Sequence, residues 1–303
     1  MIRHSGIGAF WHWVRANPMI TRLLSLPRTQ LLLGLTLILV LLHGIDEFMW
    51  TTLPARCLAV AMLLSREWLR SRWAWLGLAV LLGGHTIWAW SALVNHDYMI
   101  AYWVGVCAIA VWSKAPKHVF AWNARLLIGL CFLFATAWKL ISGEYLDGSF
   151  LHLTFLLDAR LEMGAALLGG VSLDALAANR DLFESLGIVT PATLETTPLL
   201  STISVVLSYW TILIEGLVAL AFLAPGIKYL YDNREWVLLL FIVTTYTVIP
   251  VLGFGGILFI MGLAQCKQPN RQKIYLTLLL LMPIWMPLPQ ALFYVAGRFL
   301  GTS

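Results

Sequence analysis

The stretch VFAWNARLLIGLCFLFATAWKLI, residues 119–141, decides the fold class of this chain. It is an almost unbroken apolar run of the length that a membrane-spanning helix needs, about 20 residues. Arg125 interrupts it near its start and Lys139 near its end. The 303 residues are 60% hydrophobic and only 12% charged, whereas a soluble domain is about 25% charged. We therefore expect an all-α, polytopic membrane helix bundle.

Other apolar runs recur along the whole chain and predict eight or nine transmembrane helices. Residues 236–266 are interrupted by Pro250 and by Gly253, Gly255 and Gly256, which favours two short helices or one broken helix over a single span. The candidate spans are 30–49, 53–69, 73–93, 98–113, 119–141, 201–224, 236–250, 252–266 and 274–297.

The lysines and arginines between the spans predict the orientation, because cytoplasmic loops carry an excess of these residues. With a cytoplasmic N-terminus, fourteen of them lie on the cytoplasmic side and four on the other side. We expect a multi-pass protein of the cell inner (plasma) membrane. Residues 1–29, with Trp11 and Trp13, are predicted to lie on the cytoplasmic surface as an amphipathic segment. Residues 30–303 are predicted to form a single transmembrane domain. The expected cytoplasmic segments are 1–29, 66–72, 114–118, 225–235 and 267–273.

Residues 142–200 form the longest stretch between spans, and the predicted orientation places them outside. Within them, the apolar positions of LDALAANRDLFESLG, residues 173–187, are spaced as on a helix. We expect an external helical loop.

Composition also excludes some classes of function. The four cysteines form no CxxC pair, and the histidines and acids match no metal motif, so we predict no disulfide framework and no metal site. The net charge of +5 is what basic cytoplasmic loops produce, and we exclude nucleic-acid binding.

Ionisable residues near the spans gather on the external side. His43, Asp46 and Glu47 lie at the end of the first span, and Asp97 lies in the turn before the fourth. His43 shares a helical face with Glu47 and can also pair with Asp46. An imidazole oriented by a carboxylate is an acid/base unit, although the same group is also typical of a polar pair at a helix end.

Lys139 has two interpretations. A lysine near a helix end can bury its aliphatic stem and lift its ammonium to the membrane surface. Alternatively, a lysine shielded from water can act as a base near neutral pH.

Glu215, in YWTILIEGLVALAF, lies far from either end of the sixth span, so it must pair, be protonated or face water. The fifth and sixth spans run antiparallel. We expect a buried ion pair of Glu215 with Arg125, or a contact of Glu215 with a polar group of another helix.

The residues WKLISGEYLDG, 138–148, resemble the signature of the HTTM superfamily, the horizontally transferred transmembrane domain. The resemblance is carried by Lys139-Leu140, Tyr145 and Gly148, with Tyr145 standing where the family usually has tryptophan. This family includes the membrane domain of vitamin K-dependent gamma-glutamyl carboxylases. The resemblance implies that Lys139 is a base, facing outward, that deprotonates a quinol. The chain lacks the large lumenal domain of those carboxylases, so glutamate carboxylation is not expected.

The leading hypothesis is a membrane enzyme or maturation factor in which Lys139 acts on a lipid-soluble, quinol-like or peptide substrate. His43, Asp46, Glu47 and Asp97 would be its polar partners, and Trp138, Tyr145, Asp147 and His152 would contact the substrate. A quinone or quinol is the candidate cofactor, and the candidate partners are the lipid bilayer and a membrane or secreted protein. The alternatives are a non-catalytic membrane subunit, whose polar groups only join helices, and a transporter that uses Glu215.

Overall fold

The computed structural model describes residues 18–42, 49–185, 193–289 and 291–292, and in these residues it is all-helical. The chain divides into two compact units, residues 1–128 with 251–282 and residues 129–250 with 283–303. The expected single transmembrane domain stays a prediction, as does the amphipathic segment, because residues 1–17 lie outside the described part.

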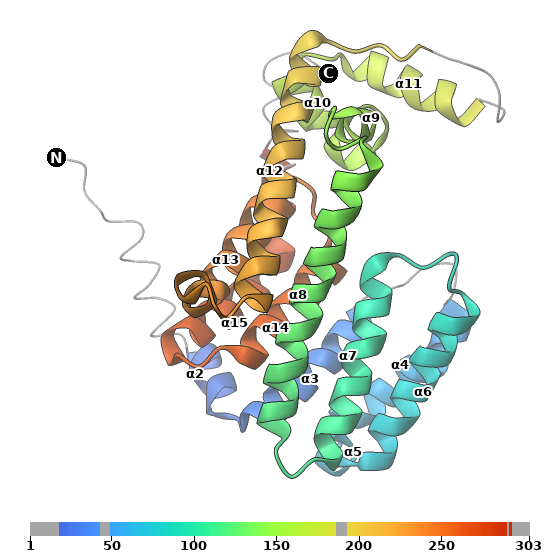
Figure 1. The fold of residues 1–303 in the computed structure, drawn as a ribbon. Coiled ribbons are helices and arrows are strands. Elements are labelled where there is room, and N and C mark those ends of the chain that lie inside the picture. Colours follow the sequence, from blue (N-terminus) through green and yellow to red (C-terminus); the bar gives the residue numbers. More distant parts are fainter. Residues whose placement is uncertain (1–17, 43–48, 186–192, 290, 293–303) are drawn as a thin grey trace. The chain divides into compact units, whose positions relative to one another are not determined.

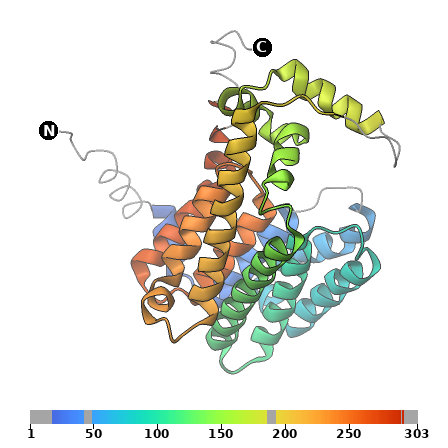
Figure 2. The same ribbon diagram turned by 45° about the horizontal axis from the view of Figure 1, so that its top comes forward.

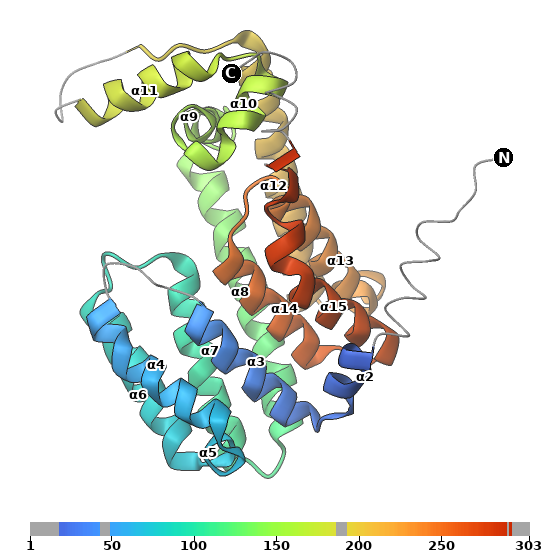
Figure 3. The same cartoon turned by 180° about the vertical axis from the view of Figure 1, so that it is seen from behind.

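The first unit is a bundle around the buried helix α14, Leu252–Gln265 (Figure 3). Helix α14 packs against α3 and α7, α3 packs against α4, and α6 packs against both α4 and α7. The large side chains Trp75 and Trp103 are fully buried here, and Trp103 donates a hydrogen bond to Thr36 at 3.0 Å. The other elements are α2 (Pro18–Ser25), α3 (Arg28–Leu42), α4 (Met49–Leu64), α5 (Arg66–Arg70), α6 (Arg72–Trp88), α7 (Asn95–Trp112), the first part of α8 (Pro116–Ser142) and most of α15 (Pro269–Trp285).

The second unit contains the rest of α8 and the long helix α12, Pro198–Leu223, which packs against α13 (Figures 1 and 2). Its remaining elements are α9 (Ser149–Leu157), η1 (Ala159–Leu161), α10 (Glu162–Gly169), α11 (Leu173–Ser185) and α13 (Lys228–Tyr246). Helix α12 begins cleanly because the Thr197 hydroxyl accepts a hydrogen bond from Leu200 N and proline occupies the first turn.

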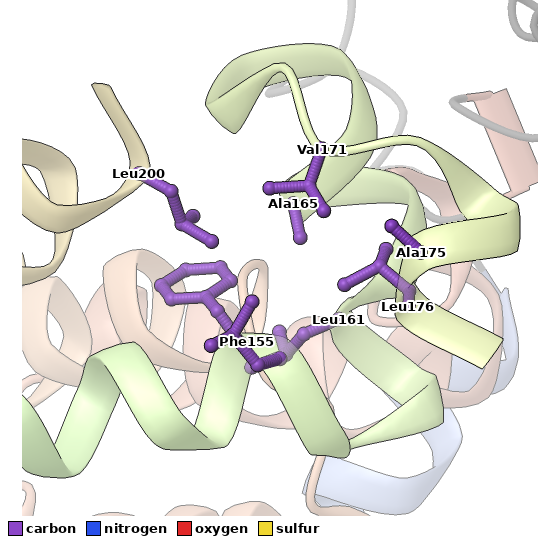
Figure 4. Packing of buried hydrophobic residues seen from close by; sticks show 8 residues of the cluster. Phe155, Leu161, Ala165, Val171, Ala175, Leu176 and Leu200 are labelled. Atoms are coloured by element: carbon purple, nitrogen blue, oxygen red, sulfur yellow. The ribbon is translucent and has the colours of Figure 1, made fainter. Parts of the chain in front are cut away.

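The three short helices after α8 enclose a small apolar core against the start of α12. Phe155, Leu161, Val171 and Leu176 point toward one another and toward Leu200 (Figure 4). Asn179 of α11 ties the returning chain down, because its side chain exchanges two hydrogen bonds of 2.8 Å with the Glu195 backbone. The helical pattern predicted for residues 173–187 is thus confirmed over Leu173–Ser185.

Two described helices, α8 and α12, are long and apolar enough to cross a membrane. In the most apolar window of each, only 22% and 39% of the residues are buried inside the protein, whereas the core helix of a soluble protein would be mostly covered. Three further apolar helices are shorter, and at 1.5 Å per residue a 15-residue helix reaches about 22 Å of a core of about 30 Å. Helices α13 and α14 are separate, as Pro250 predicted.

Candidate functional site

An ion pair shielded from solvent joins two helices of the second unit. Lys139 lies in the last turn of α8, and Glu215 lies deep within α12. The Lys139 Nζ atom is 2.7 Å from Glu215 Oε2, and the two side chains are only 12% and 10% exposed. This is the distance of a charge-assisted hydrogen bond. The ammonium therefore turns to a protein partner instead of rising away from the helix.

The expected pair of Glu215 with Arg125 is wrong, and the second expectation, a polar group of another helix, holds. Close contacts fix the register of the two helices: a Cβ at Gly129 would lie 2.5 Å from Leu223 Cγ, and one at Gly216 would lie 3.6 Å from Thr136. Glu215 therefore faces the last turns of α8. Arg125 precedes Lys139 by fourteen residues on that helix, which is about 21 Å along its axis.

The turn after α8 brings an aromatic ring to the ammonium. The Tyr145 ring centroid is 4.9 Å from Lys139 Nζ, within cation–π range. The same ring stacks on Phe150 of α9 at 4.5 Å. Burial, with the negative charges of Glu215 and Glu144, raises the pKa of the Tyr145 phenol. The phenol is therefore a hydrogen-bond donor throughout the physiological pH range.

Two buried hydroxyl oxygens lie on the same helix faces as the ion pair. Thr136 Oγ1 lies one turn before Lys139, and Ser208 Oγ lies two turns before Glu215. Within the described part of the chain, neither oxygen has a hydrogen-bond partner. Buried polar atoms are nearly always hydrogen-bonded, so each exception calls for a water or another molecule at that place.

The remaining groups near the pair come from α8 and α13. Cys131 lies two turns before Lys139, and both its thiol and the buried Tyr246 hydroxyl lie within electrostatic range of Glu215. The sequence interpretation missed Thr136, Cys131 and Tyr246. The spacing of three residues between Thr136 and Lys139 was the available signal for the first.

The predicted substrate-contacting residues separate into two groups. The Tyr145 ring contacts Lys139 of the ion pair. The Trp138 side chain is exposed on the outside of α8. Asp147 lies just before α9, and its carboxylate accepts a hydrogen bond from Ser149 N at 2.8 Å. Hydrogen bonding by the Ser149 side chain and backbone holds the pKa of Asp147 below the usual range. His152 Nε2 lies 2.6 Å from Thr196 Oγ1, and burial lowers the pKa of its imidazole.

The predicted polar partners of Lys139 are not placed beside it by the described structure. His43, Asp46 and Glu47 lie outside the described residues. Asp97 belongs to the first unit, where its carboxylate accepts a hydrogen bond from Val94 N at 3.0 Å at the start of α7. There it lines a cavity of about 50 Å³ together with Arg56 and His85.

Groups of three or more histidines, cysteines or acids able to hold a metal ion do not occur in the part of the chain that the structure covers.

Comparisons of the chain with protein-family models, with curated proteins and with solved structures find no match. The functional interpretation therefore depends on the residues and geometry described above.

Proposed function

We propose that this chain is an HTTM-like integral protein of the inner membrane, with eight or nine spans and a cytoplasmic N-terminus. Its centre would be the Lys139–Glu215 pair, which exchanges a proton with a lipid-soluble, quinol-like substrate. The proposal is supported above all by one observation: the pair is shielded from solvent, and two buried hydroxyl oxygens on the same helix faces lack protein partners in the described part of the chain. The resemblance of residues 138–148 to the family signature supports it independently.

The pair can supply a base without any change in the total charge of the site. Transfer of one proton across the 2.7 Å bond, from Lys139 Nζ to Glu215 Oε2, gives a neutral amine and a neutral carboxylic acid. Poorly solvated surroundings narrow the energy difference between an ion pair and a neutral pair, because both charges lose their hydration. The amine then takes the hydroxyl proton of a quinol, leaving a quinolate beside an ammonium.

Tyr145 would complete the centre. Its phenol remains protonated because its pKa is raised, so it can donate a hydrogen bond to the quinolate oxygen as negative charge develops there. Thr136 and Ser208 carry the hydroxyls that would donate to the carbonyl or hydroxyl oxygens of the same ligand.

A naphthoquinol in proteoliposomes tests the proposal, because a quinolate reduces oxygen faster than the quinol does. The quinolate gives two electrons and its remaining hydroxyl proton to O₂, yielding quinone and hydroperoxide anion. Wild type should raise the rate of oxygen uptake, whereas Lys139→Arg should not, because a guanidinium stays charged. Lys228→Arg, at the exposed start of α13, is the matched control. Equal oxygen uptake by wild type and Lys139→Arg would sink the proposal.

A non-catalytic membrane subunit is the second candidate, favoured by the closeness of α8 and α12 at Gly129 and Gly216. In that case the ion pair only joins the two helices. The oxygen uptake of wild type distinguishes the two functions, because a pair that only joins helices would not raise it above that of empty liposomes. The exchanged variant Lys139→Glu/Glu215→Lys should restore stability under either function, and under the proposed function it should still lack oxygen uptake, because the base would then lie on α12.

A further inference from the structure

The first unit carries a basic, tryptophan-rich surface at one end. We define the basic–Trp surface as residues 66–73 and 112–118. It is built by α5, the start of α6, and the turn between α7 and α8, which lie at the same end of this unit (Figures 1 and 3). Five of its exposed side chains are basic and one is acidic, Glu67. The basic residues are Arg66, Arg70, Arg72, Lys114 and Lys117.

Ring contacts hold the two halves of this surface together. The Trp73 and Trp112 rings meet edge to face, with centroids 5.4 Å apart. The Arg72 guanidinium lies over the Trp112 ring at 5.3 Å. Trp73 remains 71% exposed and Trp112 47% exposed. The guanidinium is therefore fixed in direction by a ring on one side while it remains accessible from the other.

An open hollow of about 520 Å³ lies next to these residues. A water molecule occupies about 30 Å³ of liquid, so the hollow has room for a much larger group. It is lined by Leu58, Glu67, Trp68, Ser71, Trp73 and Ala74. Its walls are thus mainly apolar or aromatic, and the basic side chains stand at the adjoining surface. The Ser71 side chain accepts a hydrogen bond from Ala74 N at 3.3 Å, which fixes its place at the start of α6.

We propose that the basic–Trp surface binds an anionic phospholipid of the cytoplasmic leaflet. The phosphodiester group would lie against Arg70 and Arg72, and the glycerol and upper acyl chain would lie along Trp68 and Trp73 in the hollow. Five positive charges against one negative charge complement such a headgroup. Tryptophan is the side chain that prefers the boundary between headgroups and hydrocarbon. This inference depends on the membrane placement within the proposed function, but not on the chemistry of Lys139.

The apolar hollow favours a lipid over a soluble anion. A soluble phosphate would use only the charges and would leave the exposed faces of the Trp68 and Trp73 rings uncovered. A juxtamembrane basic cluster gains about fivefold in affinity for an anionic surface with each lysine or arginine. This gain in affinity falls as the salt concentration rises, because salt screens the attraction between exposed charges and the Debye length is about 10 Å at 0.1 M.

The test uses the full chain in neutral phosphatidylcholine nanodiscs that contain a small fraction of phosphatidylglycerol with brominated acyl chains. Quenching of tryptophan fluorescence reports the lipid close to the rings. Wild type should show saturable quenching that falls at high salt and that persists when inorganic phosphate replaces chloride at constant, low ionic strength. Arg70→Gln/Arg72→Gln should weaken binding roughly 10- to 30-fold.

The matched control is Lys267→Gln/Lys273→Gln, which removes the same charge from another predicted cytoplasmic segment of the same unit. It should leave quenching unchanged, as should Lys139→Arg. An equal loss in both double variants, equal quenching by brominated phosphatidylcholine, or displacement by inorganic phosphate would each overturn the inference. Lys139→Arg separates this result from the proposed function, because it affects oxygen uptake alone.

Discussion

Replacing Lys139 by methionine should destabilise the protein strongly at pH 7 and much less at pH 5. Methionine replaces the aliphatic stem of lysine but leaves Glu215, which is only 10% exposed, without its partner. A carboxyl group with the ordinary pKa of about 4.3 can be neutralised at pH 7 for about 3.7 kcal/mol, at 1.36 kcal/mol for each pH unit. Breaking a buried ion pair by removing one partner costs about 3–5 kcal/mol. We therefore expect a loss of about 3–4 kcal/mol at pH 7 and about 1 kcal/mol at pH 5.

The converse variant, Glu215→Gln, should cost less, about 1–2 kcal/mol. Lys139 lies in the last turn of α8, so its ammonium can turn outward once the carboxylate is gone. The double variant Lys139→Met/Glu215→Gln leaves neither charge uncompensated, and replacing a buried pair by neutral groups is often without cost. The two single losses should therefore exceed the double loss by about 2 kcal/mol or more.

Reversible unfolding in mixed micelles, followed by circular dichroism at pH 7 and pH 5, measures all four proteins. The reasoning is refuted if the single losses are equal and add up in the double variant, because additivity means that the two side chains do not interact. A Lys139→Met loss that stays the same at pH 5 would show that the cost does not come from an uncompensated carboxylate.

Two further variants test the short helices of the second unit. Asn179→Ala should cost about 1–3 kcal/mol, because it removes two hydrogen bonds between the buried Asn179 side chain and the Glu195 backbone, at about 0.5–1.5 kcal/mol each; hydrogen exchange at the Glu195 amide should accelerate, and unchanged exchange would contradict this. Burial lowers the pKa of His152, so its contribution to stability is present above its unfolded pKa of about 6.5 and is lost as the pH falls through the lower folded value. The melting temperature of His152→Gln should consequently fall less than that of wild type on acidification below pH 6.5.

The helical class could be predicted from the sequence because it follows from local properties. The long runs at 119–141 and 201–224 contain few polar residues, and they form α8 and α12 with nearly the expected bounds. Proline and glycine predicted the interruption at Pro250 in the same way. The number of membrane-spanning helices could not be predicted in the same way. Helices α7 and α13 begin with polar turns, and α3 and α14 are short, so composition alone does not decide which of them cross a membrane.

The partner of Glu215 could not be predicted from the sequence, because it depends on the register of two antiparallel helices. Sequence runs indicate where helices begin and end, and aligning the ends of 119–141 and 201–224 places Arg125 near Glu215. The contact of Gly129 with Leu223 fixes a different register, in which α12 continues well beyond the end of α8. The extra turns carry residues such as Leu200 that look no different in sequence from membrane-facing leucines, yet they pack against α9 and α10.

The offset of α8 and α12 along their axes also explains why the candidate site forms where it does. Helix α8 ends at Ser142, so the chain must turn back against the middle of α12 rather than beyond its end. It does so at Gly148, whose φ of +78° suits glycine, and where a Cβ would lie 2.7 Å from Val205 Cγ2. The turn therefore packs closely against α12, and this places the Tyr145 ring next to the Lys139 ammonium. The same register of the two helices places the Glu215 carboxylate against the Lys139 ammonium. The ion pair and its aromatic neighbour are thus two consequences of one feature, the end of α8 beside the middle of α12.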